Sequence, residues 1–289
     1  MVPGCTESNF GSDHDVNETL RRVYEDFKKT PLAKDWPIED TNRVEFAARV
    51  KMFGMAIPYL LKPQGVVFDV GTGGGIAARF FKLLGCRVVS VDSESASGME
   101  AIENVRLAGV EAFPCDIERD SLPADAGSVD VVVFTDVIEH LHHSPKLALE
   151  EMMRILRPGG VVIASTPNAV RFTVRLKVLW GVSNWPKIWD YFDRPASHFG
   201  HHHEYTIEEF KGVFERTGFV IEKFCLDESN SLTASFAGLQ DLQTGIRAGS
   251  PKGRTKFYLA RRVIWACAEI FPRLRSTMTL VARKPLRQP

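Results

Sequence analysis

Histidines and carboxylates gather in the middle of this 289-residue chain. Seven of the eight histidines lie between residues 140 and 203. Asp136, Glu139 and His140 occupy positions i, i+3 and i+4, which share one face of a helical turn. His203 closes a run of three histidines further along. Carboxylates and imidazoles grouped in this way can hold a divalent cation, and an imidazole can also accept a proton near neutral pH.

A glycine-rich segment lies upstream, between an apolar run and an amphipathic one. The apolar run ends in Asp69, and Gly71, Gly73 and Gly75 follow at alternate positions. This order indicates a buried strand, a tight loop and a helix. The lack of Cβ atoms lets a ligand approach the backbone closely. Dinucleotide sites space their glycines as GxGxxG, so a third glycine one residue early disfavours a pyrophosphate ligand.

Two further acids follow expected strands. Asp92 ends the strand that begins at Arg87, about twenty residues after the glycine loop. A carboxylate at this position can accept hydrogen bonds from both hydroxyls of a ribose. Asp116 follows the next strand, with Ile117 beside it. Acids are common after strands, so a helix cap or a turn is the alternative interpretation of each.

The Asp-x-Gly-x-Gly-x-Gly pattern at 69–75 resembles the first motif of the class I S-adenosylmethionine (SAM)-dependent methyltransferases. The segments 129–141 and 156–168 closely resemble those of small-molecule and quinone O-methyltransferases in the same superfamily. The resemblance covers about residues 45–226. It implies a Rossmann-like fold, with SAM as the cofactor and methyl donor.

The resemblance also implies roles for single residues. The residues assigned to SAM binding in this way are Asp69, Gly71, Gly73, Gly75, Asp92, Asp116, Ile117 and Asp136. Among them, the three glycines would hold the methionine end, and Asp92 would hold the ribose. Asp116 would contact the adenine amino group, and Ile117 would pack on the base.

The turn from Asp136 to His140 resembles that of two metal-assisted groups, the ubiquinone-pathway O-methyltransferases and the small-RNA 2′-O-methyltransferases. Both carry glutamate where this chain has Asp136. The resemblance implies a divalent cation on Asp136, Glu139, His140 and His203, which would lower the pKa of an acceptor hydroxyl. A metal-free alternative uses His140 or His203 as general base, with Glu139 beside it. In a third interpretation, the two acids only shape the loop and contact SAM.

The elements that must position these residues alternate between strand and helix from residue 66 onwards, which predicts a doubly wound α/β sheet. We expect seven strands, mostly parallel, and the resemblance implies that the last one is antiparallel. The expected strands are 66–70, 87–91, 110–114, 129–134, 159–165, 219–226 and 277–283. The expected helices are 16–29, 41–61, 75–84, 98–107, 144–156 and 206–217. Arg157-Pro-Gly-Gly160 predicts a turn before the fifth strand.

We expect a single methyltransferase domain over residues 1–289, with N-terminal helices and two cap insertions. The expected parts are N-terminal helices at 15–61, a SAM-binding core at 62–166, a first insertion at 167–205, core at 206–227, a second insertion at 228–275, and the last strand and tail at 276–289. Substrate choice in such folds resides in insertions over the carboxyl edge of the sheet. Three of the five tryptophans lie in the first insertion, among basic residues. This composition suits an amphipathic acceptor such as a lipid-linked glycan, a peripheral membrane contact, or a self-contained helical subdomain.

Charge and cysteine content bear on the binding partners and on the cellular location of the protein. The formal net charge is zero, but residues 247–289 contain eleven Lys or Arg and a single acid. The basic C-terminal region could bind an anionic acceptor, an anionic membrane surface or nucleic acid. Alternatively, it packs on the acidic rest of the chain. The five cysteines form no CxxC pair, and no run of about 18 apolar residues occurs. We therefore expect reduced thiols and a cytoplasmic protein, membrane-peripheral at most.

The sequence predicts SAM-dependent methyl transfer, most readily to a hydroxyl oxygen of a small molecule, a glycan or a lipid-linked acceptor. An RNA 2′-O-methyltransferase is the first alternative, although no recognisable RNA-binding module accompanies the basic residues, which disfavours nucleic acid. A non-catalytic SAM-binding scaffold or regulatory protein is the second alternative. A dehydrogenase is the third. The acceptor, the oligomeric state and the role of the basic C-terminal region are left open.

Overall fold

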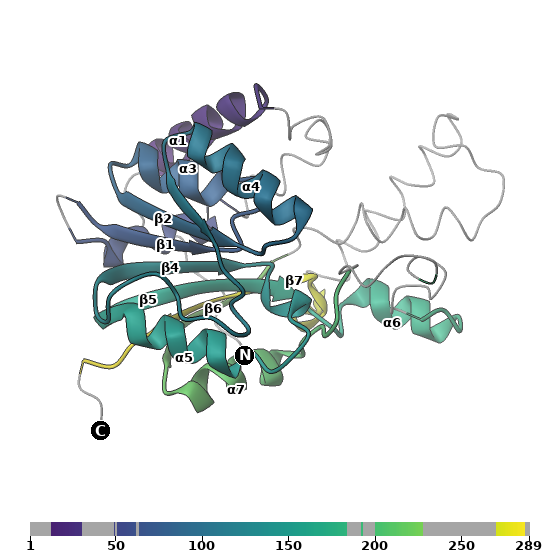
Figure 1. Ribbon diagram of the computed structural model, residues 1–289. Coiled ribbons are helices and arrows are strands. Elements are labelled where there is room, and N and C mark those ends of the chain that lie inside the picture. The colour runs from purple at the N-terminus through teal and green to yellow at the C-terminus, as the bar shows by residue number, and fades with distance from the viewer. Residues whose placement is uncertain are drawn as a thin grey trace.

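A seven-stranded sheet forms the centre of the protein (Figure 1). The computed structural model describes residues 13–30, 49, 51–61, 64–183, 192, 200–227 and 270–286. The strands are β1 (Val66–Val70), β2 (Arg87–Asp92), β3 (Glu111–Pro114), β4 (Val129–Thr135), β5 (Leu156–Pro167), β6 (Val220–Asp227) and β7 (Thr277–Arg283). Their order in the sheet is β3-β2-β1-β4-β5-β7-β6. The first five pair in parallel, and β7 lies antiparallel between β5 and β6. The predicted fold class is confirmed.

Helices cover both faces of the sheet. Figure 1 shows α1, α3 and α4 on one face and α5 and α7 on the other, while α6 lies outside these layers. The α-helices are α1 (Asp13–Phe27), α3 (Ile76–Leu83), α4 (Ala96–Leu107), α5 (Lys146–Ile155), α6 (Phe172–Leu179) and α7 (Ile207–Thr217). Short 3-10 helices are η2 (Ile57–Tyr59), η3 (Ile138–His140) and η5 (Pro272–Leu274). Helix α7 begins with a capping box, in which Thr206 Oγ1 accepts from Glu209 N and a Glu209 carboxylate oxygen accepts from Thr206 N.

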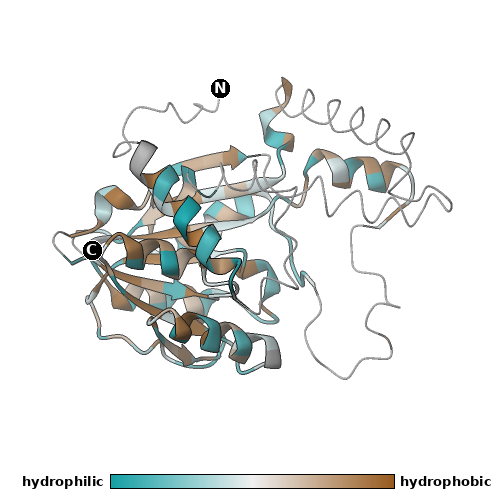
Figure 2. Cartoon of the chain, turned by 90° about the horizontal axis from the view of Figure 1, so that it is seen from above, coloured by the Kyte–Doolittle hydropathy of each residue, from teal (hydrophilic) through white to brown (hydrophobic). Residues whose placement is uncertain are grey.

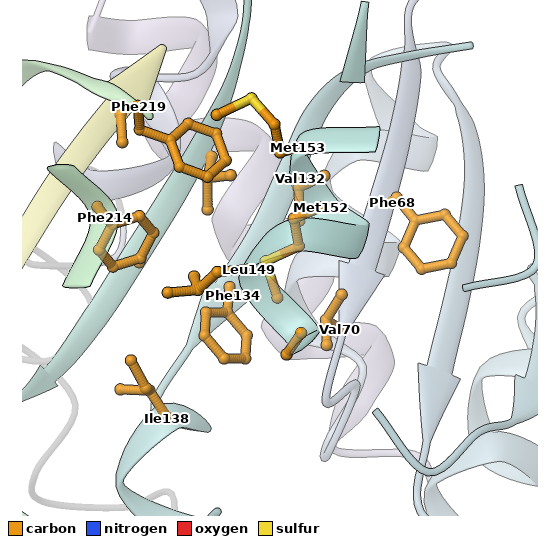
Figure 3. Close-up of a cluster of buried hydrophobic side chains, with 14 of the residues drawn as sticks. Phe68, Val70, Val132, Phe134, Ile138, Leu149, Met152, Met153, Phe214 and Phe219 are labelled. Carbon is orange, nitrogen blue, oxygen red and sulfur yellow. The ribbon is translucent and has the colours of Figure 1, made fainter. Parts of the chain in front are cut away.

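The central strands are apolar on both faces because helices cover both faces. Alternate residues of β4 therefore enter different cores. Val132 and Phe134 pack towards α5 and α7, and Figure 3 shows Phe134 beside Leu149 in this cluster. Val131 and Val133 belong to the cluster on the α3 and α4 side. The same arrangement is visible in Figure 2, where apolar strands lie between helices with hydrophilic outer faces.

The strand order of the sheet reverses beside β1. From β1 the chain proceeds outward to β2 and β3, and then returns to β4 on the other side of β1. Ligands of doubly wound sheets bind where the strand order reverses in this way, at the carboxyl ends of the strands. The glycine loop follows β1, Asp92 ends β2, and Asp136 follows β4. Parallel pairing thus brings three of the predicted site segments to one edge.

Two expectations require correction. Arg157-Pro-Gly-Gly160 lies within β5, which begins at Leu156, and the β4–β5 register shifts next to it. Gly159 adopts a left-handed backbone with φ = 79° where the register shifts. The motif therefore forms a bulge within the strand and not a separate turn. Cys86 and Cys115 are free thiols as expected, but Cys225 in β6 is disulfide-bonded. The expectation that all five cysteines are reduced is therefore wrong.

Several expectations fall outside the described residues. They concern residues 41–48 of the expected helix at 41–61, the insertion tryptophans at 185 and 189, and the second insertion up to residue 269. The division into insertions and core stays a prediction. In the part of the chain that the structure describes, no helix is long and apolar enough to cross a membrane.

The buried pair of Asp130 and Arg157 yields a stability prediction. Asp130 is 3% exposed; it accepts hydrogen bonds from Arg157 Nε and from Val66 N, at 2.7 Å for the latter. Asp130→Asn leaves one of these donors facing an amide N–H, so we expect the free energy of unfolding to fall by about 2–4 kcal/mol. Urea unfolding followed by circular dichroism measures the change.

Glu111→Gln is the matched control for this variant. Glu111 pairs with Arg87 at 3.3 Å, but both side chains are more than half exposed. Such a pair contributes less than about 1 kcal/mol. An equal loss in the two variants would contradict the assignment of Asp130 as a structural charge.

Candidate functional site

The glycine loop has a left-handed backbone that only glycine adopts without strain. Gly71, Gly73 and Gly75 have φ values of 74°, 47° and 71°. A Cβ atom on Gly71 would lie 2.3 Å from Val137 Cγ2, in the turn after β4. Gly71 N and Thr72 N both donate to the Val91 carbonyl, at 2.9 and 3.2 Å. The loop is therefore held tightly between β2 and the β4 turn.

A buried arginine that the sequence did not point to, Arg79, holds the glycine loop from the side of the helices. Arg79 in α3 is 6% exposed and donates to the Gly74 carbonyl at 3.1 Å. Asn104 in α4 donates to the same carbonyl at 3.2 Å and accepts from Arg79. These contacts hold the Gly74 carbonyl towards the helices. An arginine within an amphipathic helix gives no sequence signal of such a role.

Asp92 lies at the glycine loop, as its predicted role requires. Its Oδ2 accepts a hydrogen bond from Gly73 N at 3.0 Å, and its Oδ1 accepts from Ser93 N at 2.8 Å. A carboxylate has about four acceptor positions, so it retains capacity for two ribose hydroxyls. Asp92 is half-buried, so part of its side chain is accessible to solvent.

Asp69 lies beneath the loop and is 3% exposed. Thr72 Oγ1 donates to its Oδ2 at 3.0 Å. Burial raises the pKa of Asp69 to about 7, against the opposing effect of the Thr72 hydrogen bond. Arg49 opposes this rise as the smallest of the effects, so the charged carboxylate is disfavoured below neutral pH.

The predicted adenine residues lie on the loop after β3. Asp116 accepts hydrogen bonds at Oδ1 from Glu118 N (3.0 Å) and forms an ion pair with Arg119 at 3.5 Å. Ile117 is partly buried and packs against the core of the α5 side. Both residues thus have structural roles in the loop, and their contact with a base stays a prediction.

The turn after β4 carries the remaining predicted residues. Asp136 has φ = 55°, a left-handed conformation that aspartate tolerates better than most residues. Its N–H donates to the Ser165 carbonyl at 2.9 Å, and its Oδ1 accepts from Ser165 Oγ at 2.9 Å. These bonds tie the start of the turn to β5, next to the Val137 side chain that faces Gly71.

Glu139 is buried at 1% exposure. Its Oε2 accepts a hydrogen bond from Thr166 Oγ1 at 3.0 Å. Burial raises the pKa of Glu139 well above its usual range, and the neighbouring Asp136 and Glu204 raise it further. The carbonyl of Glu139 accepts hydrogen bonds from the N–H groups of His202 and His203, which hold the histidine run against this turn.

Glu139, His140 and His201 form a compact group of metal-ligating side chains. One ligand atom from each lies within 4.8 Å of the others. The rings of His140 and His201 meet edge to face, with centroids 4.9 Å apart. His140 Nδ1 lies 3.1 Å from the Gly200 carbonyl, which can only accept, so Nε2 is left as the acceptor of this ring. Burial lowers the pKa of His140, which favours the neutral imidazole.

The structure brings together only part of the predicted metal set. Within the described residues, the group contains neither His203 nor Asp136. His203 is exposed, and its ring packs on Tyr205 at 4.7 Å. His201 occupies the place that the sequence analysis gave to His203. Three adjacent histidines cannot be told apart by type, and only the path of the backbone decides which one points inward.

Comparison with known proteins identifies the family. The family whose description is "Methyltransferase domain" matches residues 42–223. This chain belongs to that family. A "probable S-adenosylmethionine-dependent methyltransferase" of Mycolicibacterium smegmatis is 31% identical over 160 residues, 54% of this chain and 52% of the relative. A ubiquinone biosynthesis O-methyltransferase of Cupriavidus pinatubonensis is 33% identical over 103 residues, 35% of this chain and 41% of the relative. The chain thus spans about half the length, or less, of these relatives.

Solved structures share the fold of this methyltransferase domain. The [4+2]-cyclase SpnF has a TM-score of 0.54 at 18% identity, with 99% of each chain covered. Phosphoethanolamine N-methyltransferase 2 of Haemonchus contortus, solved with SAM, has a TM-score of 0.53 at 17% identity, covering 92% of this chain and 60% of the other. The predicted membership of the class I SAM-dependent methyltransferases, with SAM as cofactor, is confirmed.

Gly71→Ala tests whether the loop binds the cofactor. The new methyl group would collide with Val137, so the loop would have to move and we expect SAM affinity to fall at least tenfold. Isothermal titration calorimetry measures the affinity. Gly127→Ala is the control, because Gly127 also has positive φ (71°) but has open space at its Cβ position. Equal SAM affinity in the two variants would contradict the placement of the cofactor at this loop.

The pH dependence of stability in Asp69→Asn tests the raised pKa of the buried Asp69 carboxyl. Since the pKa of Asp69 rises from 3.8 to about 7, the folded state binds more protons than the unfolded state between these values. The stability contributed by protonation is therefore present at low pH and is lost as pH rises towards 7. We expect Asp69→Asn to raise stability above pH 7 relative to wild type, with the gain vanishing near pH 4. Thermal unfolding across this range measures it, and a pH-independent difference would contradict it.

Proposed function

We propose that this methyltransferase domain transfers the SAM methyl group to a hydroxyl oxygen of a small-molecule, glycan or lipid-linked acceptor. The observation that carries the proposal is the group of Glu139, His140 and His201. Its Glu139 and His140 lie on the turn whose Val137 side chain faces the glycine loop. A proton-accepting site beside the donor site is what an oxygen acceptor requires, since a neutral hydroxyl is a poor nucleophile.

The donor side needs little chemical assistance from the protein. The sulfonium of SAM is already activated, so positioning of its methyl group in line with the acceptor oxygen supplies most of the acceleration. Asp92 would hold the ribose, and the backbone at Gly71 and Gly73 would hold the methionine end. In the transfer, the acceptor oxygen forms a bond to the methyl carbon as the carbon–sulfur bond breaks, which leaves S-adenosylhomocysteine.

The acceptor side must remove one proton from the hydroxyl. Burial keeps His140 neutral by lowering its pKa, so its Nε2 can take that proton. Glu139 lies in the same group, but its raised pKa disfavours the charged carboxylate at neutral pH. In the metal-free form of this site, an imidazole is therefore the better base.

The same group also fits a divalent cation. One carboxylate and two imidazoles are ligands that Zn²⁺ or Mn²⁺ accepts, and the buried Glu139 carboxylate would become favourable in its charged form next to a cation. Glu139, His140 and His201 would hold the ion. When bound, it would supply Lewis acidity that lowers the pKa of the acceptor hydroxyl.

Names of relatives support oxygen as the target without identifying the acceptor. Several relatives are named ubiquinone biosynthesis O-methyltransferase, at 29–33% identity. The shared fold alone does not decide the reaction, because SpnF is named a [4+2]-cyclase. Exposed Trp180 and Leu179 at the end of α6, with Lys177 nearby, agree with an amphipathic or membrane-bound acceptor.

A transfer screen tests the proposal. SAM with a labelled methyl group is incubated with pools of phenols, sugars, lipid-linked glycans and RNA, each with and without a chelator. We expect label in a hydroxyl-bearing pool other than RNA. Transfer to RNA alone, with a steep salt dependence, would favour the RNA methyltransferase instead. Transfer that a chelator leaves unchanged would exclude the metal-dependent form of the site.

Glu139→Gln and His140→Ala separate acceptor activation from donor binding. We expect His140→Ala to lower the turnover number by about 10²–10⁴-fold, because the proton acceptor is lost, while SAM affinity stays within about twofold. Glu139→Gln should cause a comparable loss in the metal-dependent form of the site, where the charged carboxylate is a ligand, and a smaller loss in the metal-free form. His203→Ala is the control, since its ring lies outside the group, and it should retain turnover. A His203 variant as inactive as the His140 variant would contradict the assignment.

A further inference from the structure

The orientation of His201 depends on a carboxylate that the proposed mechanism does not use. His201 Nδ1 lies 2.8 Å from Glu204 Oε1. On the other side of the ring, Nε2 lies 4.0 Å from Glu139 Oε1. An ionised carboxylate can only accept hydrogen bonds, so the His201 proton belongs on Nδ1, and Nε2 presents a lone pair to the acceptor site.

Arg171 holds Glu204 in this position. Its two terminal nitrogens donate to the two oxygens of Glu204, at 2.6 and 3.1 Å. Only 10% of the Arg171 side chain and 12% of the Glu204 side chain are exposed. The bidentate ion pair with Arg171 fixes Glu204 in place as a charged acceptor.

Arg171 and Glu204 lie at opposite ends of the first insertion. Asn168 and Tyr205 form a bridge between the same two ends, and Ala169 N donates to the Tyr205 carbonyl at 2.9 Å. The ion pair therefore joins the beginning of the insertion to its end. His201 is attached to that junction through Glu204.

We propose that Glu204, clamped by Arg171, is a positioning residue that fixes the proton of His201 on Nδ1 and so directs the Nε2 lone pair at Glu139 and His140. Joining the ends of the first insertion thereby completes the acceptor site. A carboxylate that orients a histidine in this way sets both the ring angle and the tautomer. The consequence for catalysis rests on the proposed function, whereas the tautomer itself does not.

Glu204→Gln is the decisive variant because it keeps the size of the side chain. Arg171 needs acceptors and retains the amide oxygen, which turns the amide N–H towards His201. The ring must then accept at Nδ1, and its proton moves to Nε2. Long-range proton–nitrogen NMR at pH 8.5 distinguishes the two tautomers, and the loss of signals in His201→Gln assigns the ring.

We expect wild-type His201 to be the Nδ1–H tautomer and Glu204→Gln to shift most of the population to Nε2–H. Glu204→Ala removes the acceptor and should give a mixture. Glu208→Gln is the matched control, because Glu208 is an exposed carboxylate four residues along that pairs only loosely with Arg273, at 3.7 Å. It should leave the His201 signals unchanged. SAM affinity within about twofold of wild type in every variant shows that the domain is folded.

Wild-type His201 with its proton on Nε2, or with protons on both nitrogens, would overturn the proposal. So would Glu204→Gln with an unchanged tautomer. If the tautomer shifts as expected and methyl transfer to the acceptor found in the screen falls 10–100-fold, the positioning role extends to catalysis. A shifted tautomer with unchanged transfer would retain the positioning of His201 and reject its part in the proposed reaction.

Discussion

Parallel pairing of β1 with β2 and β4 is the constraint on which the rest of the site depends. Each of these strands ends at the same edge of the sheet, so the loops that follow them must meet there. The close approach of Gly71 to the Val137 side chain shows how tightly these loops meet. It leaves no room for a side chain at position 71, and it places the donor loop next to the turn that carries Glu139 and His140.

Electrostatics at this edge favour a positive charge. Asp69 and Glu139 are both nearly fully buried, and burial raises the pKa of each. Arg49 offsets the cost at Asp69 only in small part, whereas Glu204 is paired with Arg171 and keeps a low pKa. A sulfonium at the donor loop, or a divalent ion at the acceptor turn, would relieve this cost. The edge therefore combines two buried carboxyl groups of raised pKa with one carboxylate that is paired with an arginine and orients a histidine.

Most of the fold was predictable because its signals are local. Apolar runs bounded by glycine or acids predict six of the strands within about two residues, and the start of α7 lies within one residue of the expected helix at 206–217. The beginning of β5 was missed because Arg157-Pro-Gly-Gly160 has the composition of a turn, although pairing with β4 holds it in the strand as a bulge. The disulfide of Cys225 was also missed, since cysteine spacing alone carries no information on which thiols meet.

The sequence by itself determined the family and the cofactor. It also determined the strands that contain Asp69 and Asp92 and the strand that Asp136 follows, because glycine spacing and apolar runs are patterns of neighbouring residues. It also identified Glu139 and His140 as a pair, since one turn of chain places them together. Only the tertiary structure decided that His201, and not His203, joins that pair. The choice depends on the backbone of a returning segment, held by the Glu139 carbonyl and by the Arg171–Glu204 ion pair across the insertion. Contacts between residues more than thirty positions apart leave no pattern in a single sequence.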